Sequence, residues 1–294
     1  MEPATTEFEE STRTMYRNNL RQITTTAVLV ATLTPALAGA QTLLFDRDVT
    51  PAVIMGSGIA NGGFTVDRTS KIELGLRARL RYDEDGNPTN TVNSNGDGSY
   101  TYRARSAFPG DPFRKLLAEW NVDWSVNVGL GTDSQQVLNQ LTYVFGVDID
   151  PTAGVENWVT GDAINLTQLD PGDRCTDTSF GTNSTGAGGG VEVSSAACLT
   201  QAGLDQYASY LGTMSVAQNS WNPGLLNRIN GVSFDPTVAG EYKFYIEAIG
   251  PESRAPLART EITVITTSVP EPGPMALIGL GLAGIGWFRR RTNR

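Results

Sequence analysis

Apolar and polar residues alternate along much of the chain, and this period of two is typical of a β-strand with one buried face. Over residues 71–82, every second position from Ile72 to Tyr82 is apolar. The positions between them include four charged residues, Glu73, Arg77, Arg79 and Arg81. The pattern predicts a half-buried antiparallel strand.

Further alternating segments predict strands over 99–108, 120–130, 141–149, 241–249 and 257–265. A polar turn region, 83–98, separates the first two strands, so we expect them to form a hairpin with a long loop. The last two strands form a second pair. The turn before that pair, with Tyr242 two residues after Gly240, resembles the corner of many immunoglobulin-like sandwiches.

Two segments depart from this pattern. Residues 173–190 are rich in glycine and predict a long flexible loop. Residues 204–221 place Leu204, Tyr207 and Leu211 at near-helical spacing, which predicts a short helix. The chain as a whole therefore predicts an all-β fold, an antiparallel β-sandwich of immunoglobulin-like or jelly-roll-like type with a short helix and long loops.

The N-terminal 40 residues have the features of an export signal. A short basic stretch follows Met15, residues 23–37 are apolar without charge, and Ala38 and Ala40 form an A-x-A cleavage site. We expect the secretory translocon and signal peptidase to act here, with cleavage after Ala40. Residues 1–14 are acidic, so either translation starts at Met15 or this stretch is an uncleaved amphipathic segment that starts at Met1.

The C-terminal residues 268–294 combine three parts in a fixed order. Val269, Pro270, Glu271 and Pro272 come first, a charge-free apolar run over 275–288 follows, and Arg289, Arg290 and Arg291 come last. The run is short for a transmembrane helix, and the arginines favour a cytoplasmic position for this end, with the preceding body outside.

This order resembles the PEP-CTERM sorting signal of Gram-negative bacteria. The resemblance implies that an exosortase-like enzyme recognises the Pro-Glu-Pro segment and removes the membrane helix, so that an inner-membrane-anchored precursor becomes a surface or extracellular protein. It also implies an association with exopolysaccharide and biofilm. The alternative is an ordinary tail anchor on a proline-rich stalk. The predicted domains are 1–40, 41–267 and 268–294.

The body between the two signals is acidic. It has 15 basic and 26 acidic residues, a net charge of −11, which disfavours nucleic acid as a partner. The chain has no histidine, which excludes nucleophiles activated by histidine and zinc sites with histidine ligands. We assign no catalytic residue and expect a non-enzymatic protein.

Cys175 and Cys198 are the two cysteines of the chain. In an exported protein such a pair predicts one disulfide, and two free buried thiols are the alternative.

Asp83, Asp85 and Asn87 have the spacing that starts a calcium loop, but Pro88 and Ser94 occupy the positions where an EF-hand needs glycine and glutamate. These residues are candidate Ca²⁺ ligands, and solvated turn residues are the alternative. Calcium is the one candidate cofactor.

The tryptophans divide into two groups. Trp120 and Trp124 alternate with valines and predict core packing, whereas Trp158 and Trp221 lie in less regular sequence and are candidates for an exposed ligand surface. The leading interpretation is an exported matrix or surface protein. The alternative is a secreted carbohydrate-binding, lectin-like protein or a glycoside hydrolase, which an exposed aromatic strip beside carboxylates would favour.

Overall fold

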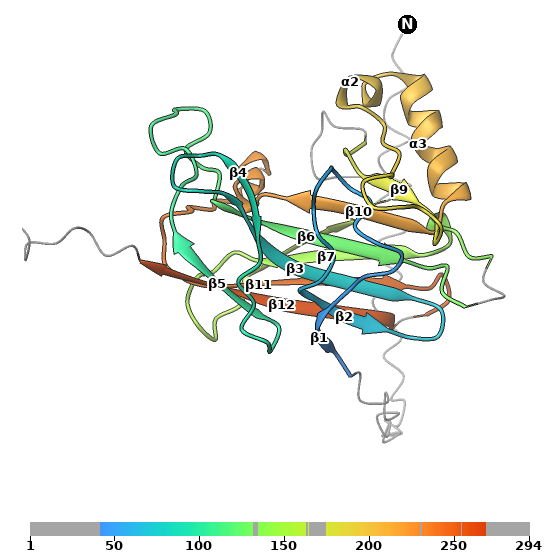
Figure 1. Cartoon of the computed structure of the whole chain (residues 1–294), viewed down its shortest axis with the longest axis horizontal. Coiled ribbons are helices and arrows are strands. Elements are labelled where there is room, and N and C mark those ends of the chain that lie inside the picture. The colour runs from blue at the N-terminus through green and yellow to red at the C-terminus, as the bar shows by residue number, and fades with distance from the viewer. Residues whose placement is uncertain are drawn as a thin grey trace, which may run out of the picture. The chain divides into compact units, whose positions relative to one another are not determined.

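Two β-sheets face each other and enclose the core (Figure 1). The computed structural model describes residues 42–131, 135–162, 164, 175–229, 231–253 and 255–268. Several predicted features lie outside these residues: Ala38, Ala40, Val269, Pro270, Glu271, Pro272 and the three arginines 289–291. Within the described part, no helix is long and apolar enough to cross a membrane.

The larger sheet, sheet A, has the strand order β1-β2-β3-β6-β10-β9, with β4 paired to β3. Its strands are β1 (Leu44–Arg47), β2 (Phe64–Arg68), β3 (Glu73–Tyr82), β4 (Pro88–Thr91), β6 (Trp120–Asn127), β9 (Ser179–Gly181) and β10 (Val216–Trp221).

The second sheet, sheet B, has the order β5-β12-β11-β7-β8. Its strands are β5 (Ser99–Ala104), β7 (Thr142–Asp148), β8 (Trp158–Asp162), β11 (Gly240–Ile249) and β12 (Pro256–Ser268). The helices in the described residues are η2 (Leu138–Gln140), α2 (Ser195–Cys198), α3 (Gln201–Thr213) and η3 (Pro223–Arg228). The all-β sandwich is confirmed.

Trp120 is at the centre of the core and is fully buried, as the alternation in 120–130 predicts. Its ring contacts Phe244 edge-on at 5.9 Å between centroids and stacks on Tyr102 at 6.2 Å, so this residue of sheet A packs on two residues of sheet B. At the corner before β11, the hydroxyl of Tyr242 donates to the carbonyl of Val238 at 3.2 Å. The contact back to the upstream backbone is that of a tyrosine corner.

The predicted hairpin of 71–82 and 99–108 is wrong. The first segment, β3, lies in sheet A, whereas β5 lies in sheet B and pairs in parallel with β12. The partner of β3 beyond the turn is β4, a short strand inside the region predicted as turn. Sequence alternation identifies strands but carries no information on which strand lies next to which.

The helix predicted over 204–221 is half correct. α3 ends at Thr213, and residues 216–221 form β10 in the middle of sheet A. The glycine-rich segment also contains more regular structure than predicted, because Gly188 and Gly190 donate their N–H groups to the carbonyls of Val53 and Ile54, both at 3.0 Å.

The outward face of sheet A is buried, although its alternation predicts exposed polar residues. The chain from 49 to 63 lies across it, with Val49, Val53 and Met55 packed on Phe64 and Val66. Gln218 of β10 holds this covering segment by accepting from the N–H of Ile54 at 2.8 Å and donating to the carbonyl of Ala52 at 2.7 Å.

Beneath this cover, Asp123 on β6 lies between the guanidinium groups of Arg77 and Arg79 on β3. The Nε atoms are 2.9 and 2.8 Å from its Oδ2, and all three side chains are buried. Arg77 also donates to the carbonyls of Ala60 and Gly62. Burial by itself would raise the pKa of Asp123, but the two guanidinium groups outweigh that effect and lower it.

The Asp123→Asn variant should lose about 3–5 kcal/mol of unfolding free energy, because it leaves two buried guanidinium groups without a counter-charge. Urea unfolding of the mature chain measures this loss. Asp85→Asn, the same change at an exposed turn, should stay within about 0.5 kcal/mol of the wild type.

The contribution of Asp123 also has a defined pH dependence. Because its folded-state pKa is lowered, the stability is full above the unfolded pKa of about 3.9 and is lost as the pH falls toward the folded-state value. A wild-type advantage that does not shrink as the pH falls below about 4 would contradict this assignment.

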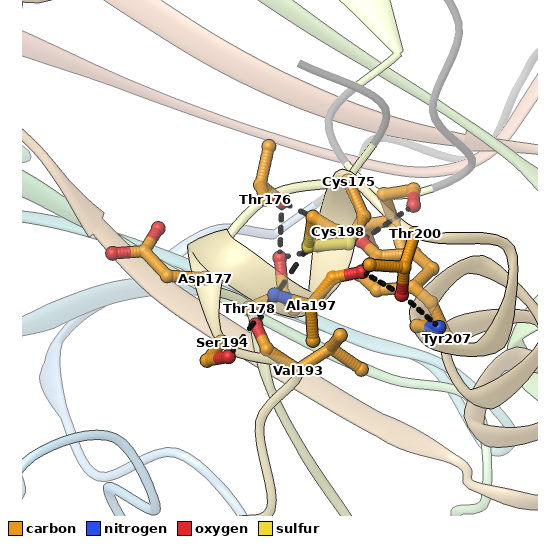
Figure 2. Close-up of a disulfide and its surroundings, with 12 residues drawn as sticks. Cys175, Thr176, Asp177, Thr178, Val193, Ser194, Ala197, Cys198, Thr200 and Tyr207 are labelled. Carbon is orange, nitrogen blue, oxygen red and sulfur yellow. Dashed lines mark hydrogen bonds between the residues drawn. A yellow bond between two sulfur atoms is a disulfide. The ribbon is translucent and has the colours of Figure 1, made fainter.

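The predicted disulfide between Cys175 and Cys198 is confirmed (Figure 2). Both residues are buried, and the bond joins α2 to the segment that leads into β9. Next to it, the hydroxyl of Tyr207 on α3 donates to the carbonyl of Ile164 at 2.9 Å. The bond therefore holds the helical part of the chain against the edge of sheet A.

Replacing both cysteines with serine should lower the unfolding free energy by about 3 kcal/mol, the value for a loop that closes over 23 positions. A reducing agent should lower the urea midpoint of the wild type to that of the double variant and leave the midpoint of the double variant unchanged. An unchanged wild-type midpoint would contradict a stabilising role for the bond.

Candidate functional site

The outward face of sheet B is not covered by any of the described residues in the way that 49–63 cover sheet A, and it carries a row of three planar side chains, Trp158, Tyr245 and Arg259. We call this row the aromatic strip. Tyr245 points outward from β11 because its neighbours Phe244 and Ile246 point into the core. Trp158 comes from the start of β8 and Arg259 from β12, so the row crosses the sheet.

Gly146 on β7 makes room for the tyrosine. It pairs with Tyr245, and a Cβ atom added to Gly146 would lie 2.2 Å from the Cε1 atom of that ring. The ring of Tyr245 therefore lies flat over the glycine. It reaches across β7 to Trp158, with the ring centroids 4.9 Å apart and the planes inclined by 61°.

Arg259 continues the row on the other side of Tyr245. Its guanidinium carbon lies 3.9 Å from the centroid of the tyrosine ring, a cation–π contact. Two carboxylates hold the guanidinium in this position: Glu247, its cross-strand partner, and Glu261, at 2.6 Å. With these contacts the planar group has little rotational freedom left.

A second ion pair borders the strip at Trp158. Glu156 accepts from Lys243 at 2.6 Å and from the indole N–H of Trp158 at 3.0 Å. The bond from Lys243, and then that from Trp158, lowers the pKa of Glu156, while the bond to Glu156 raises the pKa of Lys243. Both groups are therefore charged at neutral pH, and the border of the strip beside Trp158 is polar.

The strip is half-buried. Each of its three side chains is partly exposed, and the carboxylates beside them leave lone pairs for further hydrogen bonds. Flat apolar ring surfaces bordered by charged acceptors and donors suit a ligand with an apolar face and many hydroxyl groups. Small-molecule sites, by contrast, are usually concave.

Of the two tryptophans predicted for a ligand surface, Trp158 lies on this strip and Trp221 does not. Trp221 packs edge-on against Trp124 at 5.7 Å and Phe145 at 5.0 Å, at the margin of the core. Tyr245 and Arg259 were not singled out from the sequence, although the alternation in 241–249 and 257–265 places both on the outward face.

The candidate calcium ligands form a hydrogen-bonded turn. Asp83 accepts from the backbone N–H groups of Asp85 and Asn87, at 3.0 and 2.8 Å, and from the side-chain amide of Asn87 at 3.2 Å. These bonds direct N–H groups, not oxygen atoms, at the carboxylate. Among the described residues, no group of three or more acidic or cysteine side chains is placed to hold a metal ion.

The comparisons with known proteins concern the end of the chain. A family model, the PEP-CTERM protein-sorting motif, matches residues 268–291. The motif implies processing by an exosortase and a membrane-anchored precursor that is sorted to the cell surface. No curated protein and no solved structure matches the chain.

The Gly146→Ala variant should displace the ring of Tyr245 and break its contact with Trp158, because the added methyl group would occupy the position of the ring. Tryptophan fluorescence should therefore differ between Gly146→Ala and the wild type. When both proteins also carry Trp158→Phe, their emission should be the same. Gly186→Ala is the control, since a Cβ atom there meets nothing within 4 Å. The assignment fails if Gly146→Ala leaves the emission as it is.

Proposed function

We propose that this chain is an exosortase-sorted surface protein that binds a polysaccharide of the extracellular matrix through the aromatic strip on sheet B, without catalysis. The observation that carries the proposal is the row of Trp158, Tyr245 and Arg259, with fixed carboxylates on both sides. The sorting motif supports the location, because it implies that the precursor is sorted to the cell surface.

The chemistry of a pyranose ring fits the strip. One face of many such rings is a patch of C–H groups, which gains hydrophobic free energy on an aromatic surface. The hydroxyl groups around the ring both donate and accept, so they match the carboxylates of Glu156 and Glu247 and the N–H groups of Arg259. A strip that crosses several strands suits a chain of sugars better than a single sugar.

The charges favour a neutral polymer. Three carboxylates, Glu156, Glu247 and Glu261, border the strip, against two cations, Lys243 and Arg259. The cations are already paired with these acids, and the body as a whole carries a net charge of −11. An anionic polysaccharide would meet repulsion from the remaining negative charge.

Binding without hydrolysis is supported by the state of the carboxylates. A glycoside hydrolase needs a general acid whose pKa is raised. On this strip the pKa of Glu156 is lowered by its bonds from Lys243 and Trp158. Glu247 and Glu261 both bind Arg259, which holds them as structural partners of a guanidinium group.

Trp158→Ala should weaken binding to the exopolysaccharide of the host about tenfold, because the loss of one half-covered ring removes roughly 1.4 kcal/mol of apolar contact. Affinity electrophoresis measures this in gels that contain increasing amounts of the purified polymer. Tyr245→Ala should have a similar effect.

Phe113→Ala is the matched control, since it removes an exposed aromatic ring on the loop after β5, outside the aromatic strip, and should migrate like the wild type. Equal retardation of the wild type and Trp158→Ala would refute the assignment of the site. No retardation of the wild type by host polymer, in its neutral or its acidic fractions, would refute the proposed function.

A further inference from the structure

We infer that, in the membrane-anchored precursor, the end of the sandwich from which β12 leaves lies against the lipid bilayer and inserts apolar side chains into its interface. This proposal concerns a surface other than the aromatic strip and does not depend on polysaccharide binding.

Strand pairing defines this end of the molecule. β5 and β12 run parallel and finish together, with Ala104 opposite Ser268. Three of the connections at this end carry exposed apolar residues: 105–119 after β5, 149–157 after β7, and 222–239 before β11. Figure 1 shows the tips of β5 and β12 on the left, with η3 and the loop after β5 on the same side.

Exposed apolar side chains gather at this end. In the described part of the chain, nine large hydrophobic residues are exposed, and five of them lie on these three connections. We call these five the apolar rim: Phe113, Leu116, Val155, Leu225 and Val238. Phe113 is 94% exposed, the highest value among the nine, and a phenyl ring in contact with water on this scale is unfavourable without a partner.

Hydrogen bonds to Asp111 and a ring contact of Arg114 order the loop that carries Phe113. Asp111 accepts from the N–H groups of Phe113 and Arg114 and from the Nε atom of Arg114, at 2.9, 3.1 and 2.7 Å. The guanidinium of Arg114 also stacks on Phe108 at 4.0 Å. Phe113 is thus the one aromatic side chain of this turn that points away from the protein.

η3 connects this loop to the rest of the rim. A Cβ atom on Gly224 would lie 2.1 Å from the carbonyl oxygen of Leu116, so the backbones of the two segments touch. Asn222, just before η3, accepts from the N–H of Ala118 at 3.0 Å. Leu225 and Leu116 therefore belong to one surface.

The length of chain between the sandwich and the apolar run selects the membrane as the partner. Six residues, 269–274, separate Ser268 from Met275. Even fully extended, this stretch spans at most about 25 Å between the two Cα atoms. β12 has 13 residues and is about 43 Å long, so its near end always stays within about 25 Å of the apolar run, whereas its far end can lie much farther from it.

Apolar insertion, not charge, should provide the contact. The loop of Phe113 carries Arg114 and Lys115, but Asp111 and the acidic turn at 83–85 lie at the same end. Attraction to anionic lipids is therefore weak. The anchor holds the rim at a high local concentration, so even modest apolar affinity keeps it in the interface.

The test uses the precursor from Gln41 to Arg294, reconstituted in vesicles of phosphatidylcholine without any exosortase. An environment-sensitive dye is placed on Phe113→Cys, on Leu225→Cys or, as the control, on Leu199→Cys. Leu199 is 67% exposed and lies next to α2, outside the rim. The native cysteines are joined in the disulfide and do not take the dye.

We expect nitroxide-labelled lipid to quench the dye at 113 and 225 several-fold more than at 199, with little change when salt is added. Two positions in the rim are used so that a local disturbance by one substitution does not decide the result. Equal quenching at all three positions would overturn the inference, whether the common value is low or high. Quenching at the rim that appears only with added exosortase would also overturn it and assign the surface to the enzyme.

Discussion

Asp123 lies between two buried guanidinium groups, and the arrangement of sheet A depends on this contact. A charge can stay in the interior only if it is paired and its remaining hydrogen bonds are satisfied. Arg77 meets most of that requirement with the carbonyls of Ala60 and Gly62, although its buried Nη2 atom has no hydrogen-bond partner in the described part of the chain, and Arg79 donates to Ser220. One carboxylate thus connects β3 and β6 to the covering segment and to β10.

The covering segment closes the outward face of sheet A, whereas among the described residues the outward face of sheet B stays half-exposed. In sheet B the charged residues are paired on the surface and not in the interior. Its ion pairs form on the surface between neighbouring strands, as between Glu247 and Arg259, and stay half-exposed. The result is a surface in which Tyr245 lies over Gly146 instead of standing away from the sheet.

The sequence predicted most of the strands and which way their side chains point, because alternation follows directly from the pleat. Trp120 and Trp124 were assigned to the core, and they lie there. It did not predict that β5 pairs with β12, since no local pattern records a pairing between distant segments. For the same reason, Arg77 and Arg79 were expected to face solvent, and the contact of Tyr245 with Trp158 was missed.

The position of β12 has a consequence for the order of events during export. This strand lies between β5 and β11, and the residue that ends it is the first residue of the sorting motif. A chain that crosses the membrane from its N-terminus delivers β12 last, so sheet B stays open in the middle until the motif itself emerges. Completion of the fold and arrival of the sorting motif then coincide in time, and the processing enzyme meets a substrate that has only just become able to fold.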